Sequence, residues 1–336
     1  MKILSTVGLT SEQRRIVEEA AGDWQVADRR CRSQAEMVAA AQGGCDILLS
    51  FRAPDDLIRC APDLKWVQLT SAGVDRSMHG LLHQRNAILV TSVSGIHATA
   101  IAEYTVGSML AFAHQFHLTM RAQPRHEWMR LSFFMKTIEP LRGRTLAVIG
   151  YGSIGRETAR LGQALGMRVL ALKRNPGEPR DPGWTLPGVG DPEGRIPERY
   201  YGPGECAAIL RESDYITVTL PFTPATHRFI GAGAIAAIRP HAYIVNIGRG
   251  EVIDQAALIE ALRARRIGGA GLDVFENEPL EPESPLWDMD NVILTPHMSG
   301  SHAGYNTGVC RIFAENLRRF RAGQPLLNLV DRALGY

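Results

Sequence analysis

Four polar residues in the second half of the chain each follow a short apolar segment that is typical of a buried strand. They are Arg249, Asp273, Glu278 and His297. The carboxyl ends of parallel strands meet at one edge of a sheet, so we expect these side chains to lie at the same edge. A histidine is a proton donor that titrates near pH 7, an arginine binds an anionic substrate, and a carboxylate orients the donor. Together these residues predict chemistry that interconverts a carbonyl group and an alcohol.

Each of these residues also has a purely structural interpretation. Arg249 fits a surface charge beside a helix, and Glu278 before Pro279 fits a solvated turn. A lone histidine such as His297, which follows Thr295-Pro296, is more often an ordinary turn residue than a catalytic one. The redox interpretation therefore depends on an independent sign of a redox cofactor.

A glycine-rich turn upstream provides that sign. The segment Thr145–Ile149 reads as a strand and leads into Gly150, Gly152 and Gly155. The first glycine permits the turn, the second lets backbone N–H groups approach a pyrophosphate, and the third lets helix and strand pack closely. The phosphates would lie at the positive end of the helix dipole. A turn that binds nothing can show the same spacing, but the second strand at Arg168–Leu172 supplies the context that the motif requires.

The composition is that of a globular protein with about two domains. The chain has 336 residues, of which 45% are hydrophobic, and its net charge is +2. A charge this small gives no electrostatic reason to expect nucleic acid or a membrane surface as a partner. The five cysteines show no metal-ligand spacing, which predicts reduced thiols, no metal site and a cytoplasmic location. No apolar segment has the roughly 18 residues of a membrane helix, and the amino terminus reads as a strand rather than a signal peptide.

Strand-like and helix-like segments alternate along most of the chain, which predicts an α/β protein with parallel sheets. The expected strands are Lys2–Val7, Asp46–Leu49, Trp66–Leu69, Ala87–Val90, Thr145–Ile149, Arg168–Leu172, Tyr215–Leu220, Tyr243–Gly248, Gly269–Phe275 and Asn291–Thr295. The expected helices include Ser11–Ala21, capped by Ser11, Ser33–Gln42, Pro54–Cys60, Gln255–Arg265 and Ala303–Gly323. We expect the last helix to return to the first domain. The domains are then residues 1–97 with 301–336, and residues 98–300.

Two long segments do not fit this alternation. Ala98–Leu118 is apolar nearly all round, which predicts one long helix buried either in a core or between subunits. Pro176–Gly204 is rich in proline and glycine and reads as a long loop without regular structure. Such a loop can cover the adenosine side of the site or make a subunit contact, and the sequence does not decide between them.

Eight short motifs together resemble the D-isomer-specific 2-hydroxyacid dehydrogenase family. They are Ser71-Ala-Gly-Val-Asp75, Ile101-Ala-Glu103, Leu141-Arg-Gly143, Gly150-Tyr-Gly-Ser-Ile-Gly155, Leu220-Pro-Phe-Thr-Pro-Ala-Thr226, Asn246-Ile-Gly-Arg-Gly250, Leu272-Asp-Val-Phe-Glu-Asn-Glu278 and Thr295-Pro-His297. The resemblance covers almost the whole chain in the family's order. It implies a Rossmann dinucleotide-binding domain, a smaller flavodoxin-like substrate domain and a cleft between them.

The resemblance also implies a role for each candidate residue. His297 would be the general acid that protonates a 2-oxo acid during reduction, Glu278 would hydrogen-bond it and keep it protonated near neutral pH, and Arg249 would bind and polarise the substrate. The implied substrate ligands are Arg52, the backbone of Ala72 and Gly73, and Arg249. The implied cofactor ligands are Gly150, Gly152, Ser153, Ile154, Gly155, Lys173, Arg174, Pro221, Thr226 and Asp273, the last holding the nicotinamide carboxamide.

The end of the second strand of the dinucleotide unit departs from the family pattern. Members that use NAD carry an aspartate there, whereas this chain has Lys173, followed by Arg174 and Asn175. Two cations in place of an acid favour the phosphate of NADP, and we therefore expect NADP to be preferred over NAD.

Two other classes of function share this fold. One is a non-catalytic scaffold that senses dinucleotides, and the other is a dehydrogenase of the formate or phosphite type. Formate dehydrogenases of the family pair the histidine with glutamine, so Glu278 argues against formate but leaves phosphite open. The preferred prediction is an enzyme that reduces glyoxylate-like or hydroxypyruvate-like 2-oxo acids with NADPH. Family membership also implies a homodimer.

Overall fold

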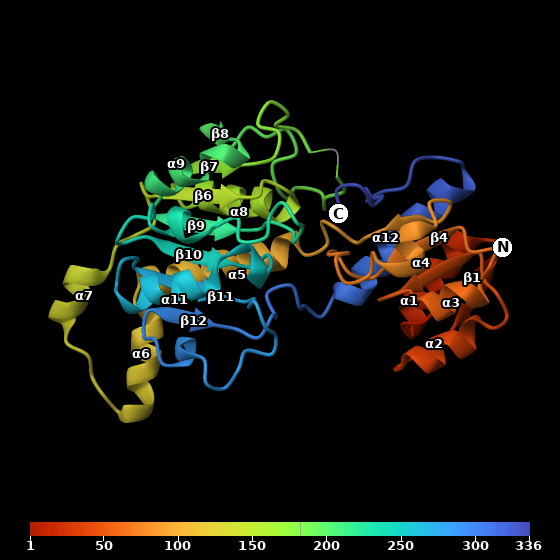
Figure 1. Ribbon diagram of the computed structural model, residues 1–336, viewed down its shortest axis with the longest axis horizontal. Helices are drawn as coiled ribbons and strands as arrows, with labels where there is room; N and C mark the ends of the chain where they lie inside the picture. The colour runs from red at the N-terminus through yellow and green to blue at the C-terminus, as the bar shows by residue number, and fades with distance from the viewer. Residues whose placement is uncertain (182) are drawn as a thin grey trace. The chain divides into compact units, whose positions relative to one another are not determined.

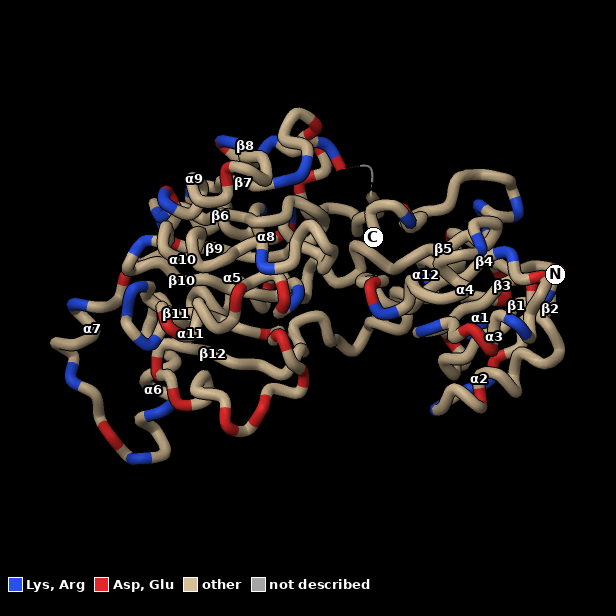
Figure 2. Tube along the Cα trace, viewed as in Figure 1, with Lys and Arg blue, Asp and Glu red and all other residues tan. Residues whose placement is uncertain are grey.

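A computed structural model describes residues 1–181 and 183–336. The chain divides into two compact units, one made of Met1–His97 and His302–Tyr336, and the other of Ala98–Ser301 (Figure 1). Basic and acidic positions are interspersed along both units (Figure 2). Within the described residues, no helix is both long enough and apolar enough to cross a membrane. All five cysteines are free.

The first unit is built on a five-stranded parallel sheet with the order β2-β1-β3-β4-β5. Its strands are β1 (Lys2–Ser5), β2 (Gln25–Asp28), β3 (Ile47–Ser50), β4 (Trp66–Leu69) and β5 (Leu89–Thr91). Its helices are α1 (Ser11–Ala21), α2 (Gln34–Ala41), α3 (Asp55–Cys60), α4 (Gly80–Gln84) and α12 (Tyr305–Arg321). This strand order is the flavodoxin-like one, in which ligands bind beyond the carboxyl ends of the strands.

The carboxyl-terminal helix α12 packs on this sheet. The fully buried Trp66 of β4 lies with its ring centroid 5.2 Å from Phe313 and 5.6 Å from Phe320, both on α12. Large aromatic rings bury much apolar area, so this contact ties the two ends of the chain into one core.

Two details of the first unit differ from the sequence-based expectation. The strand β2 was not predicted, because its four residues alternate between exposed and half-buried at the sheet edge and show no apolar run. The helix α1 is capped by Thr10 rather than Ser11: Thr10 Oγ1 accepts from the Gln13 backbone N–H at 3.3 Å, and Gln13 Oε1 accepts from Thr10 N–H at 3.0 Å. This reciprocal pair is a capping box.

The second unit is built on a seven-stranded parallel sheet with the order β12-β11-β10-β9-β6-β7-β8. Its strands are β6 (Thr145–Ile149), β7 (Arg168–Leu172), β8 (Arg199–Tyr201), β9 (Tyr215–Val218), β10 (Tyr243–Asn246), β11 (Gly269–Leu272) and β12 (Val292–Leu294). Its helices are α5 (Ala98–Ala113), α6 (Phe116–Ala122), α7 (Leu131–Thr137), α8 (Ser153–Ala164), α9 (Cys206–Arg211), α10 (Ala232–Ile235) and α11 (Gln255–Arg263), with the short 3₁₀ turns η1 (Gln123–Arg125), η2 (Pro203–Glu205), η3 (Gly250–Val252) and η4 (Pro285–Trp287).

Counted from β6, the first six strands follow the Rossmann order 3-2-1-4-5-6, and β12 adds a seventh. The structure thus confirms the predicted α/β fold with a Rossmann unit. From β6 the chain adds β7 and β8 on one side of the sheet and then crosses to add β9 on the other side. The boundary between the parallel strands β6 and β9 is therefore the topological switch point, where ligands of such sheets bind.

The segment predicted as an irregular loop, Pro176–Gly204, contains a strand. Arg199–Tyr201 forms β8 and pairs in parallel with β7, so the prediction of a loop throughout is wrong. The strand has only three residues, but the side chain of Tyr201 is fully buried in the core of the unit. This burial explains why so short a segment pairs with β7. Pro182, inside the predicted loop, lies outside the described residues.

The predicted helix Ala98–Leu118 is two helices. The helix α5 ends at Ala113, Gln115 adopts a left-handed backbone conformation with φ of 59°, and α6 then begins at Phe116. The apolar face of α5 packs against α8, β10 and β11 of its own unit. Of the two sequence-based alternatives for this helix, the structure therefore shows the core.

Candidate active site

The glycine-rich turn joins β6 to α8 in the geometry that its spacing predicts. Gly150 has φ of 104°, and its N–H donates to Leu172 O on β7 at 2.9 Å. A Cβ atom at Gly155 would lie 2.3 Å from Gly150 O, so only glycine lets α8 approach the turn this closely. The Thr219 hydroxyl, just after β9, donates to the same Gly150 carbonyl at 2.5 Å. The turn is thus held from both neighbouring strands.

Gly152 differs from the other two glycines because there is room for a side chain at its Cα atom. A Cβ atom there would meet no atom of the described residues within 4 Å. Gly152 is also the N-cap of the twelve-residue helix α8, whose first turn contains no acidic residue. Ser153, Ile154 and Gly155 form the first turn of α8. Their N–H groups donate no capping hydrogen bond to a side chain of the N-cap residue, because that residue is glycine. Free N–H groups and the helix dipole at such an end attract a phosphate.

The loop after β9 contains Pro221 and Thr226, two predicted cofactor ligands. The Thr226 hydroxyl donates to Pro221 O at 2.7 Å and accepts from the Thr223 N–H at 2.8 Å. In this structure Thr226 fixes the shape of its own loop at the carboxyl edge of the sheet. A Cβ atom at Gly248, in the loop after β10, would lie 2.6 Å from the Leu220 carbonyl oxygen of this loop. The two loops are therefore in close contact.

Lys173 and Arg174 follow β7, at the same edge. The Lys173 ammonium donates to the Glu178 carbonyl, and the pKa of Lys173 is lowered, first by burial and then by the nearby Arg156 guanidinium. Lys173 is half-buried and bonded to the segment that follows it, and the Arg174 side chain is exposed to solvent. The structure separates the two cations that the sequence treats as equivalent.

Sequence reasoning missed a buried arginine beside the turn. Arg156 is 1% exposed, its guanidinium lies 4.6 Å from the centre of the Tyr151 ring, and its Nη1 donates to Asp191 O at 2.5 Å. Its Nε donates to Asp181 at 3.2 Å, and the Tyr151 hydroxyl donates to the Asp191 carboxylate at 2.8 Å. These bonds anchor the long segment after β7 to α8. The partners are 25 and 35 residues away in the sequence, so no local pattern signals them.

His297 and Glu278 are in direct contact. The Nδ1 atom of His297 lies 2.9 Å and 3.1 Å from the two carboxylate oxygens of Glu278. The carboxylate also accepts from the Phe275 N–H at 3.3 Å, which holds it in the loop after β11. The Glu278 side chain is 20% exposed and the His297 side chain 43%. Because Nδ1 donates to the carboxylate, the opposite ring nitrogen, Nε2, is left to exchange a proton with a substrate.

Asp273 is fully buried, and its carboxylate accepts hydrogen bonds from the segment that carries His297. One carboxylate oxygen accepts from the Thr295 hydroxyl at 2.6 Å and the Met298 N–H at 2.9 Å, and the other accepts from the Ser299 N–H at 2.9 Å. Asp273 was predicted to hold the nicotinamide carboxamide. In the structure its carboxylate holds three partners of the chain itself.

Arg249 lies between β10 and η3 and is half-buried. Its guanidinium donates to Gly248 O at 2.9 Å, and the Asn246 amide donates to the Arg249 carbonyl at 3.0 Å. A Cβ at Gly250 would lie 1.9 Å from the Phe275 carbonyl carbon. The loop that carries Arg249 is therefore in backbone contact with the loop that carries Glu278. The structure thus brings the loops of all three predicted catalytic residues to one edge of the sheet.

The predicted substrate ligands Arg52, Ala72 and Gly73 belong to the first unit. Arg52 follows β3, is exposed, and its guanidinium lies 5.8 Å from the centre of the Phe51 ring. The loop after β4 is closed by the Ser71 hydroxyl, which donates to Gly73 O at 2.8 Å. Both loops lie at carboxyl ends of strands, where ligands of such sheets bind.

Comparison with known proteins identifies the family. A family model described as "D-isomer specific 2-hydroxyacid dehydrogenase, NAD binding domain" matches residues 106–299. The glyoxylate reductase of Aeropyrum pernix is 34% identical over 290 residues, which cover 85% of this chain and 82% of that relative. The chain belongs to the D-isomer-specific 2-hydroxyacid dehydrogenase family.

Two further relatives show the range of the family. The glycerate dehydrogenase of Methylorubrum extorquens is 30% identical, and the match covers 86% of this chain and 87% of that one. The NADPH-dependent glyoxylate/hydroxypyruvate reductase of Sinorhizobium meliloti, solved in complex with NADP and sulfate, has a TM-score of 0.77 at 27% identity. That match covers 100% of this chain and 99% of the other. This 2-hydroxyacid dehydrogenase is thus an oxidoreductase that uses a nicotinamide dinucleotide.

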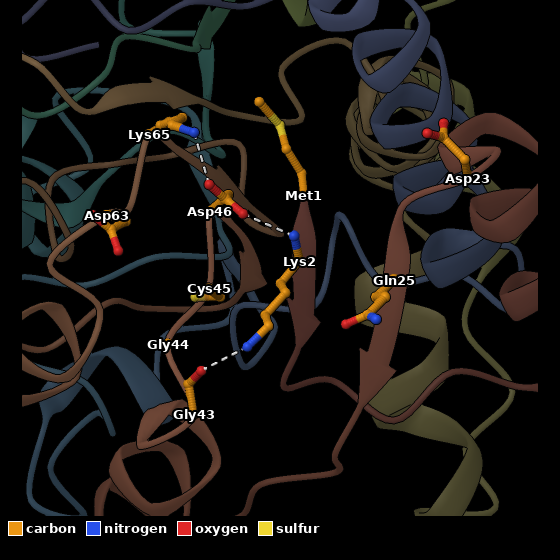
Figure 3. Close-up of a pocket in the computed structure, with 10 residues that line it drawn as sticks. All are labelled: Met1, Lys2, Asp23, Gln25, Gly43, Gly44, Cys45, Asp46, Asp63 and Lys65. Carbon is orange, nitrogen blue, oxygen red and sulfur yellow. Dashed lines mark hydrogen bonds and ion pairs between the residues drawn. The ribbon is translucent and has the colours of Figure 1, made fainter.

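A hollow elsewhere on the dehydrogenase lies at the opposite edge of the first sheet. It is lined by Met1, Lys2, Asp23, Gln25, Gly43, Gly44, Cys45, Asp46, Asp63 and Lys65 (Figure 3). Two of its charges pair with each other, since Lys65 Nζ lies 2.8 Å from Asp46, and the other oxygen of Asp46 accepts from the Lys2 backbone N–H at 2.8 Å. Because the amino ends of β1, β3 and β4 meet here, the hollow faces away from the edge that binds ligands in such sheets.

Proposed function

We propose that this dehydrogenase reduces a small 2-oxo acid, of the glyoxylate or hydroxypyruvate kind, to a D-2-hydroxy acid with NADPH. The contact between His297 and Glu278 at the carboxyl edge of a Rossmann sheet supports the proposal most directly. The named activities of the relatives in Aeropyrum pernix and Sinorhizobium meliloti agree with this substrate class.

The residues of the second unit divide the proton transfer and the binding between them. The dinucleotide, when bound, supplies a hydride. His297 donates a proton from Nε2 to the substrate's keto oxygen, and Glu278 stabilises the protonated imidazole through Nδ1. Arg249 binds the substrate and polarises its carbonyl group. Gly150, Gly152 and the first N–H groups of α8 hold the pyrophosphate.

Arg52 and the backbone N–H groups of Ala72 and Gly73 are the proposed ligands of the substrate carboxylate. Successive N–H groups in a tight loop bind anions. The loop is preorganised, since Ser71 bonds back to Gly73 and Tyr305 donates its hydroxyl to Thr70 O.

We also propose that NADP is preferred over NAD. The chain has no acid at the end of β7 to repel the ribose phosphate, and the exposed Arg174 offers a bidentate partner for it. The half-buried Lys173 and the exposed Arg174 both supply positive charge for that phosphate.

A screen of purified protein against glyoxylate, hydroxypyruvate and phenylpyruvate, each with NADPH and with NADH, tests both proposals. We expect turnover with at least one 2-oxo acid and a lower KM for NADPH. A lower KM for NADH would contradict the cofactor preference alone. Dinucleotide binding without turnover of any acid would favour the non-catalytic scaffold.

We further propose that the protein is a homodimer. The segment from α6 to α7 leaves large apolar side chains exposed, with Trp128 96%, Leu131 73% and Met135 78% exposed. In Figure 1 this segment extends away from the sheet of its own unit. Exposed apolar area of this kind marks a surface that another chain covers.

A further inference from the structure

The five residues Thr295 to Ser299 wrap around Asp273. The N–H of Thr295 donates to Leu272 O at 3.0 Å, and that of His297 donates to Asp273 O at 2.8 Å. The next two N–H groups, of Met298 and Ser299, donate to the Asp273 carboxylate at 2.9 Å each. His297 therefore lies at the centre of a segment whose backbone is bonded to Leu272 before it and to the buried Asp273 at and after it.

This wrap holds His297 in a conformation that the residue does not favour by itself. Its φ is 50°, in the left-handed region, which costs a non-glycine residue free energy unless its surroundings compensate. The direction of the imidazole depends on this backbone conformation, because the side chain leaves from Cα. Any loosening of the wrap changes where Nε2 points.

The wrap is linked to helix α5 by a chain of two hydrogen bonds. The Tyr104 hydroxyl lies 2.7 Å from the Thr295 hydroxyl, which lies 2.6 Å from the Asp273 carboxylate. A carboxylate only accepts, so Thr295 donates its single hydroxyl proton to Asp273, and Tyr104 must donate to Thr295. Burial raises the pKa of Tyr104 to about 12, so the phenol keeps its proton throughout the neutral and mildly alkaline range. Bonds that run in one direction strengthen each other.

We propose that Tyr104 and Thr295 are positioning residues that fix the wrap and, through it, the direction of the His297 imidazole. This inference rests on the proposed role of His297 as proton donor. Tyr104 stands on α5, which packs against α8, β10 and β11, so it connects the wrap to a rigid element of the same unit. Neither side chain has to touch the substrate for this role.

The variants Tyr104→Phe and Thr295→Val each remove one hydroxyl and change the volume little. We expect kcat for reduction to fall roughly 3- to 10-fold, the effect of losing one hydrogen bond, with KM for the dinucleotide unchanged. Thr295→Ser keeps the hydroxyl and should restore most of kcat.

The matched control is Tyr243→Phe. The Tyr243 hydroxyl lies 2.9 Å from the hydroxyl of Ser108, which stands on α5 one turn after Tyr104. Within the described part of the chain, the Tyr243 hydroxyl makes no hydrogen bond to residues 295–299. Tyr243→Phe removes a tyrosine hydroxyl that also contacts α5. Its kcat should stay within about twofold of the wild-type value, a smaller change than the loss of one hydrogen bond to the wrap would cause.

A second readout does not depend on activity. Amide hydrogen exchange of the peptide covering residues 295–301 reports the bonds of Met298 and Ser299 to Asp273. We expect faster exchange in Tyr104→Phe and Thr295→Val, and unchanged exchange in Tyr243→Phe and Thr295→Ser.

Unchanged exchange and unchanged kcat in Tyr104→Phe and Thr295→Val would overturn the positioning role, as would an equal fall of kcat in Tyr243→Phe. If the wild-type enzyme reduces no 2-oxo acid, the proposed function is wrong. The exchange comparison then still decides whether these hydroxyls hold the wrap.

Discussion

At the residue scale, the proposed chemistry depends on the imidazole of His297, which offers Nε2 to a substrate while Nδ1 is bonded to Glu278. The neighbouring Asp273 carboxylate cannot take the place of His297, because it is fully buried and bonded to the backbone. We expect His297→Ala to lower kcat by about 10²- to 10⁴-fold, the contribution of a general acid. Dinucleotide affinity, measured by fluorescence titration, should not change. Retention of wild-type turnover would show that another group donates the proton.

Glu278 acts on the same donor through a direct contact. Its carboxylate lies 2.9 Å from Nδ1 of His297, and Glu278→Gln keeps the shape while it removes the charge. We expect kcat for reduction to fall about tenfold, because a hydrogen bond to a charged acceptor is exchanged for one to a neutral amide. Steady-state kinetics measure the change, and an unchanged kcat would mean that the carboxylate does not influence the donor.

At the element scale, the three glycines of the turn have different tasks, and substitution separates them. A methyl at Gly155 would lie 2.3 Å from Gly150 O, whereas one at Gly152 meets no described atom. We expect Gly155→Ala to lower the free energy of unfolding by about 1–3 kcal/mol, as overpacking does. The free energy of unfolding of Gly152→Ala should stay within about 1 kcal/mol of the wild-type value. This variant should bind NADPH about tenfold more weakly, because the methyl group occupies the space proposed for the pyrophosphate.

Thermal unfolding and dinucleotide titration measure the two effects. Gly107→Ala is the control, since Gly107 lies in α5 and a methyl there meets no described atom within 4 Å. It should leave both the unfolding temperature and the affinity unharmed. Equal loss of stability in both turn variants would contradict this division of tasks.

The same elements show what the sequence can predict. Gly150, Gly155 and the loops of Arg249, Glu278 and His297 were predicted because each belongs to a short motif at a strand end, and the sheet order then brings strand ends together. The strand β8 and the buried Arg156 were not predicted. Their structure depends on partners far along the chain: Tyr201 on the core below β7, and Arg156 on Asp181 and Asp191. Local periodicity carries no signal of such contacts.

At the scale of the whole molecule, exposed apolar side chains indicate the surface proposed for assembly. The apolar helix α5 packs against α8, β10 and β11 of its own unit, and the exposed apolar residues follow it at Trp128, Leu131 and Met135. They are spread over about one helical turn of α7 and the segment before it. Apolar side chains this exposed favour association, because burying each one stabilises a contact by about 1.5–3 kcal/mol.

We therefore expect the wild-type protein to have twice the mass of one chain in light scattering, and the double variant Leu131→Asp with Met135→Asp to shift toward the monomer. Two charges at the centre of an apolar contact would each have to be desolvated on association, which opposes it. The control is Leu165→Asp, at a position 36% exposed at the end of α8, and it should leave the mass unchanged. Circular dichroism shows whether the double variant stays folded. A folded double variant that remains dimeric would place the interface on another surface, and a monomeric wild type would contradict the homodimer itself.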